Sequence, residues 1–227
     1  MRLGPEILFE CPQCGHLLRK KTYLSGNTFG ASFYSDGKRI APKLGKVPAI
    51  TKCPDCDTIF WINMAKEVAK KWPFDGRVEG NWVGDVKECR FLSVYDYAHA
   101  LKEKIYKDNE EEFHLAVGLH WAFNDRVRNK ESLFGQEGDK EIWKENIYRL
   151  LLMTEGNSDY NLFRAELYRN LGAFDQCAEI IDLIRNSSEE ADNNRLKMLT
   201  EHCSKRNTLI YGWNQFSNSL IDAVNIV

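Results

Sequence analysis

The sequence lacks any apolar run long enough to cross a membrane. A transmembrane helix needs about 18 to 20 consecutive apolar residues, and the longest uncharged run, 207–221, is interrupted by Asn, Gln and Ser. The first ten residues include three charged side chains and have no apolar core of the kind that marks a signal peptide. We therefore expect neither a membrane span nor export.

Patterns that identify common enzyme sites are also absent. The chain has no G-x-x-x-x-G-K-[ST] phosphate loop and no H-E-x-x-H motif. His114 and His120 are six residues apart and fall on different faces of a helix, which favours core or surface roles over metal binding. These absences favour a protein that is not an enzyme. An enzyme with its site between two domains is kept as the last of three interpretations.

The cysteines do not suit a disulfide framework, because their number is odd. Three of the seven, Cys89, Cys177 and Cys203, stand alone in the sequence. Such a set of thiols is typical of a reducing compartment. We expect a cytoplasmic protein.

The other four cysteines form two copies of one pattern, C-P-Q-C at 11–14 and C-P-D-C at 53–56. Two thiolates separated by two residues reach one ion in a tight turn, and the next residue, Gly15 or Asp57, tolerates the unusual backbone found there. Four sulfurs predict a closed structural zinc site, with iron as the alternative because the ligands alone do not choose the metal. The predicted ligands are Cys11, Cys14, Cys53 and Cys56.

Apolar and β-branched segments surround both motifs. They predict strands at 7–10 and 17–19 beside the first motif, and a strand at 58–62 after the second that pairs back on the first module. This arrangement resembles a zinc ribbon, a rubredoxin-like module in which two C-x-x-C knuckles clamp one ion. The 38 residues between the knuckles exceed the usual spacer of about 15 to 20, so the ribbon must contain an insertion.

This insertion, 15–52, is strongly basic. It has eight Lys or Arg residues and one acid, Asp36, whose Asp-Gly pair predicts a tight hairpin turn at 35–38. Basic side chains near aromatic rings are typical of nucleic-acid binding, because they neutralise phosphates and stack on bases. The candidate contacts are Arg19, Lys20, Lys21, Lys38 and Arg39. The other interpretation is a solvated loop whose aromatic rings pack over the metal site.

The net charge and the spacing of apolar residues both change near residue 90. Residues 1–90 include 15 Lys or Arg against 10 Asp or Glu, whereas 91–227 include 16 against 23. A short helix at 63–72 and a connection at 73–88 precede the change, and helical spacing of apolar residues follows it. The expected helices cover about 94–105, starting at a Ser93–Asp96 cap, then 110–128, 142–156, 160–171 and 174–185. Two more are expected: one starting at a capping box at 187–190 and containing Leu196, Leu199 and Cys203, and one from about 208 with Leu209, Trp213, Phe216, Leu220 and Val224.

The segment 165–184 looks like one tetratricopeptide-type (TPR-like) helix pair. That motif has a small residue and an aromatic on the first helix, a Gly near the turn, and aromatic, small or apolar residues on the second. These places are filled by Ala165, Tyr168, Gly172, Phe174, Cys177, Ile181 and Ile184. The resemblance implies a stack of helical hairpins. Taken whole, a zinc ribbon followed by such helices resembles uncharacterised bacterial proteins.

The predicted fold class is α+β, with a small β-rich zinc ribbon followed by an all-α helical-hairpin domain. The predicted divisions are a ribbon with a long inserted loop at 1–72, a linker at 73–90 and the helical domain at 91–227. We expect a zinc-binding interaction or scaffold protein whose helical domain binds a protein partner. The alternative is nucleic-acid binding through the basic, aromatic loop of the ribbon.

Overall fold

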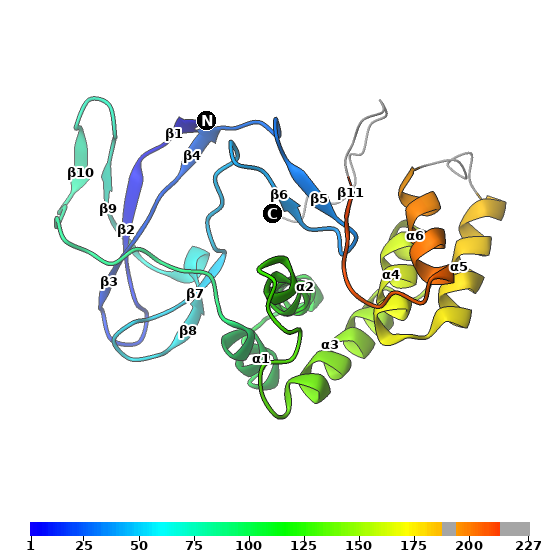
Figure 1. The fold of residues 1–227 in the computed structure, drawn as a ribbon. Helices are drawn as coiled ribbons and strands as arrows, with labels where there is room; N and C mark the ends of the chain where they lie inside the picture. Colours follow the sequence, from blue (N-terminus) through cyan, green and yellow to red (C-terminus); the bar gives the residue numbers. More distant parts are fainter. Residues whose placement is uncertain (188–193, 214–227) are drawn as a thin grey trace. The chain divides into compact units, whose positions relative to one another are not determined.

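The computed structural model describes residues 1–187 and 194–213 (Figure 1). A β-rich N-terminal part precedes six α-helices, which confirms the α+β class. The chain forms two compact units: unit 1 comprises Met1–Ala31 and Ala41–Lys107, and unit 2 comprises Ser32–Ile40 and Asp108–Val227. Within the described residues, no helix combines the length and apolar character needed to span a membrane.

Unit 1 is built from short antiparallel strands. Its largest sheet has the order β10–β9–β2–β3, with β2 (Glu6–Glu10), β3 (Leu17–Lys20), β9 (Glu67–Lys71) and β10 (Val78–Gly80). Two smaller sheets pair β1 (Arg2–Leu3) with β4 (Tyr23–Ser25), and β7 (Ile50–Lys52) with β8 (Ile59–Trp61). The strands expected at 7–10, 17–19 and 58–62 are confirmed, but β8 pairs with β7 and not with the strands of the first module.

The helix expected at 63–72 is wrong. Only a single 3-10 turn, η1 (Ile62–Met64), forms there before β9 begins. β9 pairs with β2 on one side and β10 on the other, and Ala69 is buried at its centre. These cross-strand contacts outweigh the helix propensity of its Ala, Glu and Lys residues. The connection expected at 73–88 likewise includes β10.

The first helix, α1 (Val94–Lys102), belongs to unit 1. Its expected start is confirmed, because Ser93 and Asp96 form a reciprocal capping box. The Trp61 indole N–H donates to the Ile105 carbonyl at 2.8 Å, so the chain just beyond the helix is held to β8.

Unit 2 contains the remaining helices: α2 (Asn109–Arg128), α3 (Asp139–Met153), α4 (Asn161–Leu171), α5 (Phe174–Ser187) and α6 (Asn194–Ser204). The helices expected between 110 and 185 are confirmed, with ends that differ from the expected ones by at most three residues. Gly172 has φ +77° and ends α4 in the left-handed conformation that favours glycine, so α5 starts two residues later.

One apolar cluster holds α4, α5 and α6 together. Ala165, Cys177 and Ile181 are almost fully buried in it, and Leu196, Leu199 and Cys203 contribute from α6 as expected. Tyr168 and Phe174 pack against it. The capping box expected at 187–190 concerns side chains outside the described residues.

A three-stranded antiparallel sheet completes unit 2, with the order β11–β5–β6. It consists of β5 (Ser32–Tyr34), β6 (Arg39–Ile40) and β11 (Gly212–Trp213). The hairpin turn expected at 35–38 is confirmed. The helix expected from about 208 is wrong at its start, because 212–213 pair with Tyr34 and Phe33. The rest of that prediction, including Phe216, Leu220 and Val224, lies outside the described residues.

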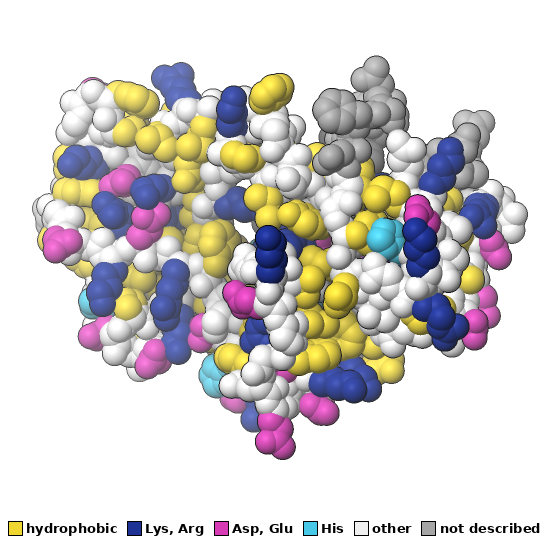
Figure 2. All heavy atoms as spheres, in the orientation of Figure 1, with side chains coloured by type: hydrophobic (Ala, Val, Ile, Leu, Met, Phe, Trp, Pro, Cys, Tyr) yellow, Lys and Arg dark blue, Asp and Glu magenta, His cyan; other side chains and the backbone are white. Residues whose placement is uncertain are grey.

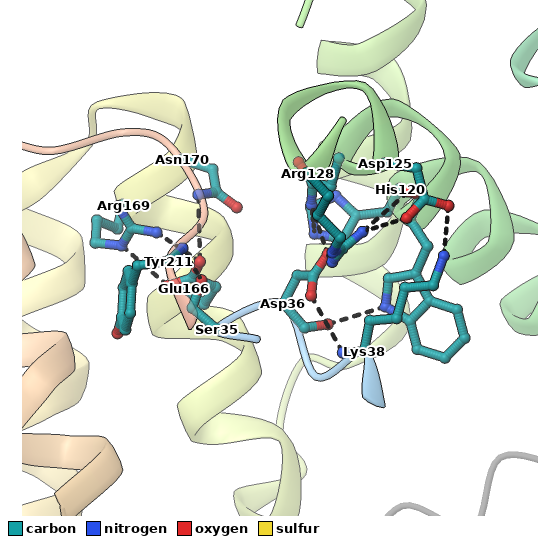
Figure 3. A network of polar contacts seen from close by, with 12 residues as sticks. Ser35, Asp36, Lys38, His120, Asp125, Arg128, Glu166, Arg169, Asn170 and Tyr211 are labelled. Atoms are coloured by element: carbon teal, nitrogen blue, oxygen red, sulfur yellow. Dashed lines mark hydrogen bonds and ion pairs between the residues drawn. The ribbon is translucent and has the colours of Figure 1, made fainter. Parts of the chain in front are cut away.

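Asp36 anchors the β5–β6 turn to α2 (Figure 3). Its carboxylate accepts a hydrogen bond from the Asn124 amide at 2.9 Å and forms an ion pair with Arg128. Its carbonyl accepts from the Trp121 indole at 3.0 Å. The Asn124 amide also donates to His120, whose pKa burial lowers, so the imidazole is neutral there.

The compact units and the predicted domains divide the chain differently. The hairpin 32–40 comes from the insertion but belongs to unit 2, and α1 belongs to unit 1. The predicted division into independently folding domains, with boundaries at 1–72, 73–90 and 91–227, therefore stays a prediction.

Asp36→Ala should lower the free energy of unfolding by about 2 kcal/mol, because Arg128 stays buried and keeps only the part-exposed Asp125 as an acidic partner. Asp182→Ala is the matched control, since it removes an exposed Asp–Arg pair and should cost less than about 1 kcal/mol. Urea unfolding of the full chain measures both. Equal effects would contradict the anchoring role of Asp36.

Candidate metal centre

The first C-P-x-C motif forms a tight turn between β2 and β3. The Cys11 N–H donates to the His16 carbonyl at 2.8 Å, and the Gly15 N–H donates back to the Cys11 carbonyl at 2.9 Å. These two bonds close the turn and hold Cys11 and Cys14 on the same loop.

The second motif repeats this pattern between β7 and β8. The Cys53 N–H donates to the Thr58 carbonyl at 2.8 Å, and the Asp57 N–H donates to the Cys53 carbonyl at 3.1 Å. The fifth residue of each turn has a positive φ, +72° at Gly15 and +59° at Asp57. The expected tolerance for this backbone at both positions is confirmed.

The two turns bring four sulfur atoms together. All lie within 4.8 Å of one another, and the Cys11–Cys56 and Cys14–Cys53 sulfurs are each 3.7 Å apart. These separations exclude disulfides, which need about 2.05 Å. Four sulfurs bound tetrahedrally at about 2.3 Å from zinc would lie about 3.8 Å apart. The spacing fits a tetrathiolate metal site.

The cluster has a buried side and an open side. Cys11 and Cys53 are buried in an apolar cluster with Phe9, Leu18, Phe60, Ile62 and Cys89, whereas Cys14 is exposed. Among the described residues, these four cysteines are the one group of three or more Cys, His, Asp or Glu side chains close enough to share an ion. A bound ion would therefore be coordinated by these four sulfurs.

The thiols of Cys56 and Cys14 differ in pKa. The Thr58 hydroxyl and backbone N–H hydrogen-bond to the Cys56 sulfur and lower the pKa of that thiol to about 6. At Cys14 a hydrogen bond from the His16 N–H also lowers the pKa of the thiol. Desolvation and the neighbouring sulfurs outweigh this bond and raise the pKa to about 12. A metal must displace the remaining protons, so its binding should tighten as the pH rises.

The five basic residues predicted to contact nucleic acid fall into two groups. Arg19, Lys20 and Lys21 lie in unit 1, whereas Lys38 and Arg39 lie in unit 2. Several are paired with acids in the structure. Arg19 lies 3.4 Å from Glu6, Lys21 lies 2.8 Å from Glu88, and Lys38 pairs with Asp125.

The aromatic residues of the insertion differ from one another in their contacts and exposure. Phe33 packs on Trp213 with ring centres 5.2 Å apart, and Arg128 lies over the Tyr34 ring at 4.5 Å. Both rings therefore pack within unit 2, and the described apolar cluster around the metal-site cysteines, where they were expected, includes neither. Phe29 remains 77% exposed.

Two buried ion pairs of unit 2 were missed by sequence reasoning (Figure 3). One joins Asp36 with Arg128, and the other joins Glu166 with Arg169 at 2.6 Å. The sequence distinguishes Asp36 as the single acid of a basic insertion but does not indicate Arg128 as its partner. An i,i+3 pair such as Glu166–Arg169 is common on exposed helices and gives no sign of burial.

Gly15→Ala should destabilise the metal-loaded chain by about 1 to 2 kcal/mol, because an L-residue pays that cost in the left-handed conformation. Gly84→Ala is the control, since a Cβ there meets open space and no positive φ is required. Thermal melting of both variants checks the prediction. If the Gly15 variant were as stable as the Gly84 variant, the requirement for glycine at position 15 would be contradicted.

Comparisons of the chain with protein-family models, curated proteins and solved structures found no match. The function is therefore argued from the geometry of the site.

Proposed function

We propose that the chain is a non-enzymatic interaction protein stabilised by a structural zinc ion. Cys11, Cys14, Cys53 and Cys56 bind the ion, and the helices of unit 2 bind a protein partner. The observation that supports the metal is the sulfur spacing, with two pairs at 3.7 Å and all four within 4.8 Å. This spacing matches the donor set of structural zinc sites.

The role of the ion follows from its closed coordination. Four protein sulfurs leave no position for water or substrate, so the ion stabilises the fold and supplies no catalytic step. It joins turns that are 38 residues apart in sequence. Metal-binding energy of this kind becomes folding energy, because the site does not exist in the unfolded chain.

The combined variant Cys11→Ser with Cys53→Ser tests the metal site. It should lose the ion and melt at a lower temperature, because both buried ligands are removed. Cys89→Ala is the matched control, since Cys89 lies in the same apolar cluster but outside the four-sulfur group. Elemental analysis and thermal melting give the result.

Stoichiometric zinc and unchanged melting in the double Ser variant would rule out this site. Iron in place of zinc would retain the site and correct the identity of the ion.

The proposed partner surface lies on α3. Tyr148 and Leu152 are one helical turn apart, and their exposed fractions are 60% and 72%. The same stripe continues to Glu141 and Glu145, which are also exposed. Figure 2 shows hydrophobic side chains exposed in the region of α3. An exposed apolar pair beside acids suits a partner with apolar and basic side chains.

Replacing Tyr148 and Leu152 together by Ser tests this surface. Proteins that co-purify with the tagged chain from its source cells should decrease at least about tenfold, as expected for loss of an apolar anchor. Val83→Ser is the control, because Val83 is similarly exposed but lies in unit 1. Quantitative mass spectrometry compares the captured proteins. Identical sets from both variants would contradict a partner site on α3.

Nucleic-acid binding by the ribbon is the second candidate. The parts of the insertion that belong to unit 1, 15–31 and 41–52, contain no acid. Their six basic residues are Arg19, Lys20, Lys21, Lys43, Lys46 and Lys52. Arg19, Lys21 and Lys52 form ion pairs with acids, for example Lys52 with Asp57 at 3.0 Å, which reduces the charge available to phosphates.

A further inference from the structure

An open groove in unit 1 is lined by two segments of the insertion, 20–26 and 44–47. The first segment includes strand β4 and the second lies beyond the hairpin that joins unit 2. The Asn27 N–H, just after the first segment, donates to the Lys43 carbonyl, just before the second, at 3.1 Å. The side chains that define the groove chemically are Lys20, Lys21, Tyr23, Leu24, Leu44 and Val47.

The shape of the groove depends on two glycines. A Cβ on Gly45 would lie 2.2 to 2.3 Å from atoms of the Tyr23 ring, so the backbone of Gly45 rests directly against that ring. A Cβ on Gly26 would lie 2.8 Å from both the Leu44 side chain and the Lys43 carbonyl. Only glycine fits at these two positions, because the Cβ of any other residue would force the segments apart.

The lining combines aliphatic side chains with positive charge. Leu24 is 61% exposed, and Leu44 and Val47 lie on the opposite segment. Lys20 and Lys21 contribute the charge, and the sequence on both sides of the groove contains no acid within 15–31 or 41–52. Lys21 does pair with Glu88, but both side chains are more than 40% exposed. A pair of this kind contributes little and exchanges readily for another carboxylate.

We propose that this groove binds a peptide segment of a partner protein that contains both aliphatic and acidic side chains. The aliphatic side chains pack against Leu24, Leu44 and Val47, and the carboxylates pair with the lysines. This interaction is separate from the α3 surface and does not depend on it.

The aliphatic lining favours a peptide over a nucleic acid. Single-stranded nucleic acid binds where bases stack on open aromatic faces. The one aromatic residue lining this groove is Tyr23, and the Gly45 backbone covers a face of its ring. Figure 2 shows Lys, Arg, Asp and Glu side chains among hydrophobic ones over the strands of unit 1.

Selection of a displayed library of short random peptides on the zinc-loaded full chain tests the proposal. Retained peptides should be enriched in Asp or Glu together with Leu, Ile or Val. The combined variant Lys20→Glu with Leu24→Ser should weaken a selected peptide by at least about tenfold in fluorescence anisotropy. The matched control is Lys130→Glu with Leu183→Ser, which makes the same exchange at exposed positions of unit 2 outside the α3 surface and should leave the affinity unchanged.

Thermal melting verifies that the variants are folded. If the double variant does not fold, the single variant Leu24→Ser, at an exposed position, replaces it in the binding measurement. No enrichment, enrichment without acids, or equal weakening by the control would overturn the proposal. A single-stranded oligothymidine is the second probe. If the groove variant weakens its binding and leaves peptide binding intact, the groove is a nucleic-acid site and the peptide proposal is wrong.

Discussion

The convergence of four sulfurs is the constraint on which unit 1 depends. Two turns of the same design, each closed by the same pair of backbone hydrogen bonds, bring Cys11 and Cys14 against Cys53 and Cys56. The strands around them are only two to five residues long and share a small apolar cluster. A core of this size stabilises a fold weakly without a cross-link. The proposed ion, held by four thiolates, would supply one, because it would tie together turns that are distant in sequence.

The same turns define both ends of the insertion, which contributes to two different structures. Its outer parts line the basic groove of unit 1, and its centre forms the β5–β6 hairpin of unit 2. That hairpin is held by Asp36 against α2 and by reciprocal backbone and side-chain bonds between Ser35 and Tyr211. The chain therefore passes between the units at three points, and neither unit is a continuous segment. Buried ion pairs such as Asp36–Arg128 favour one arrangement because few alternatives satisfy both charges.

Local patterns predicted much of this structure, and long-range pairing explains most of the errors. The C-P-x-C motifs, the Ser93 cap and the glycine after α4 have physical signatures that span a few residues, so the turns and helix ends were predicted from sequence. The segment 63–72 has the composition of a helix and becomes a strand because it pairs with β2. Likewise, 212–213 pairs with β5, far away in sequence. No pattern within a short window joins Asp36 to Arg128, which is 92 residues later.

X-ray absorption spectroscopy of the purified chain tests the central claim most directly, since it identifies the metal by its absorption edge and counts its ligands. The account predicts a zinc edge with four sulfur neighbours at about 2.3 Å and no nitrogen or oxygen ligand. A chain that contains no metal, or a metal surrounded by nitrogen or oxygen, would contradict it.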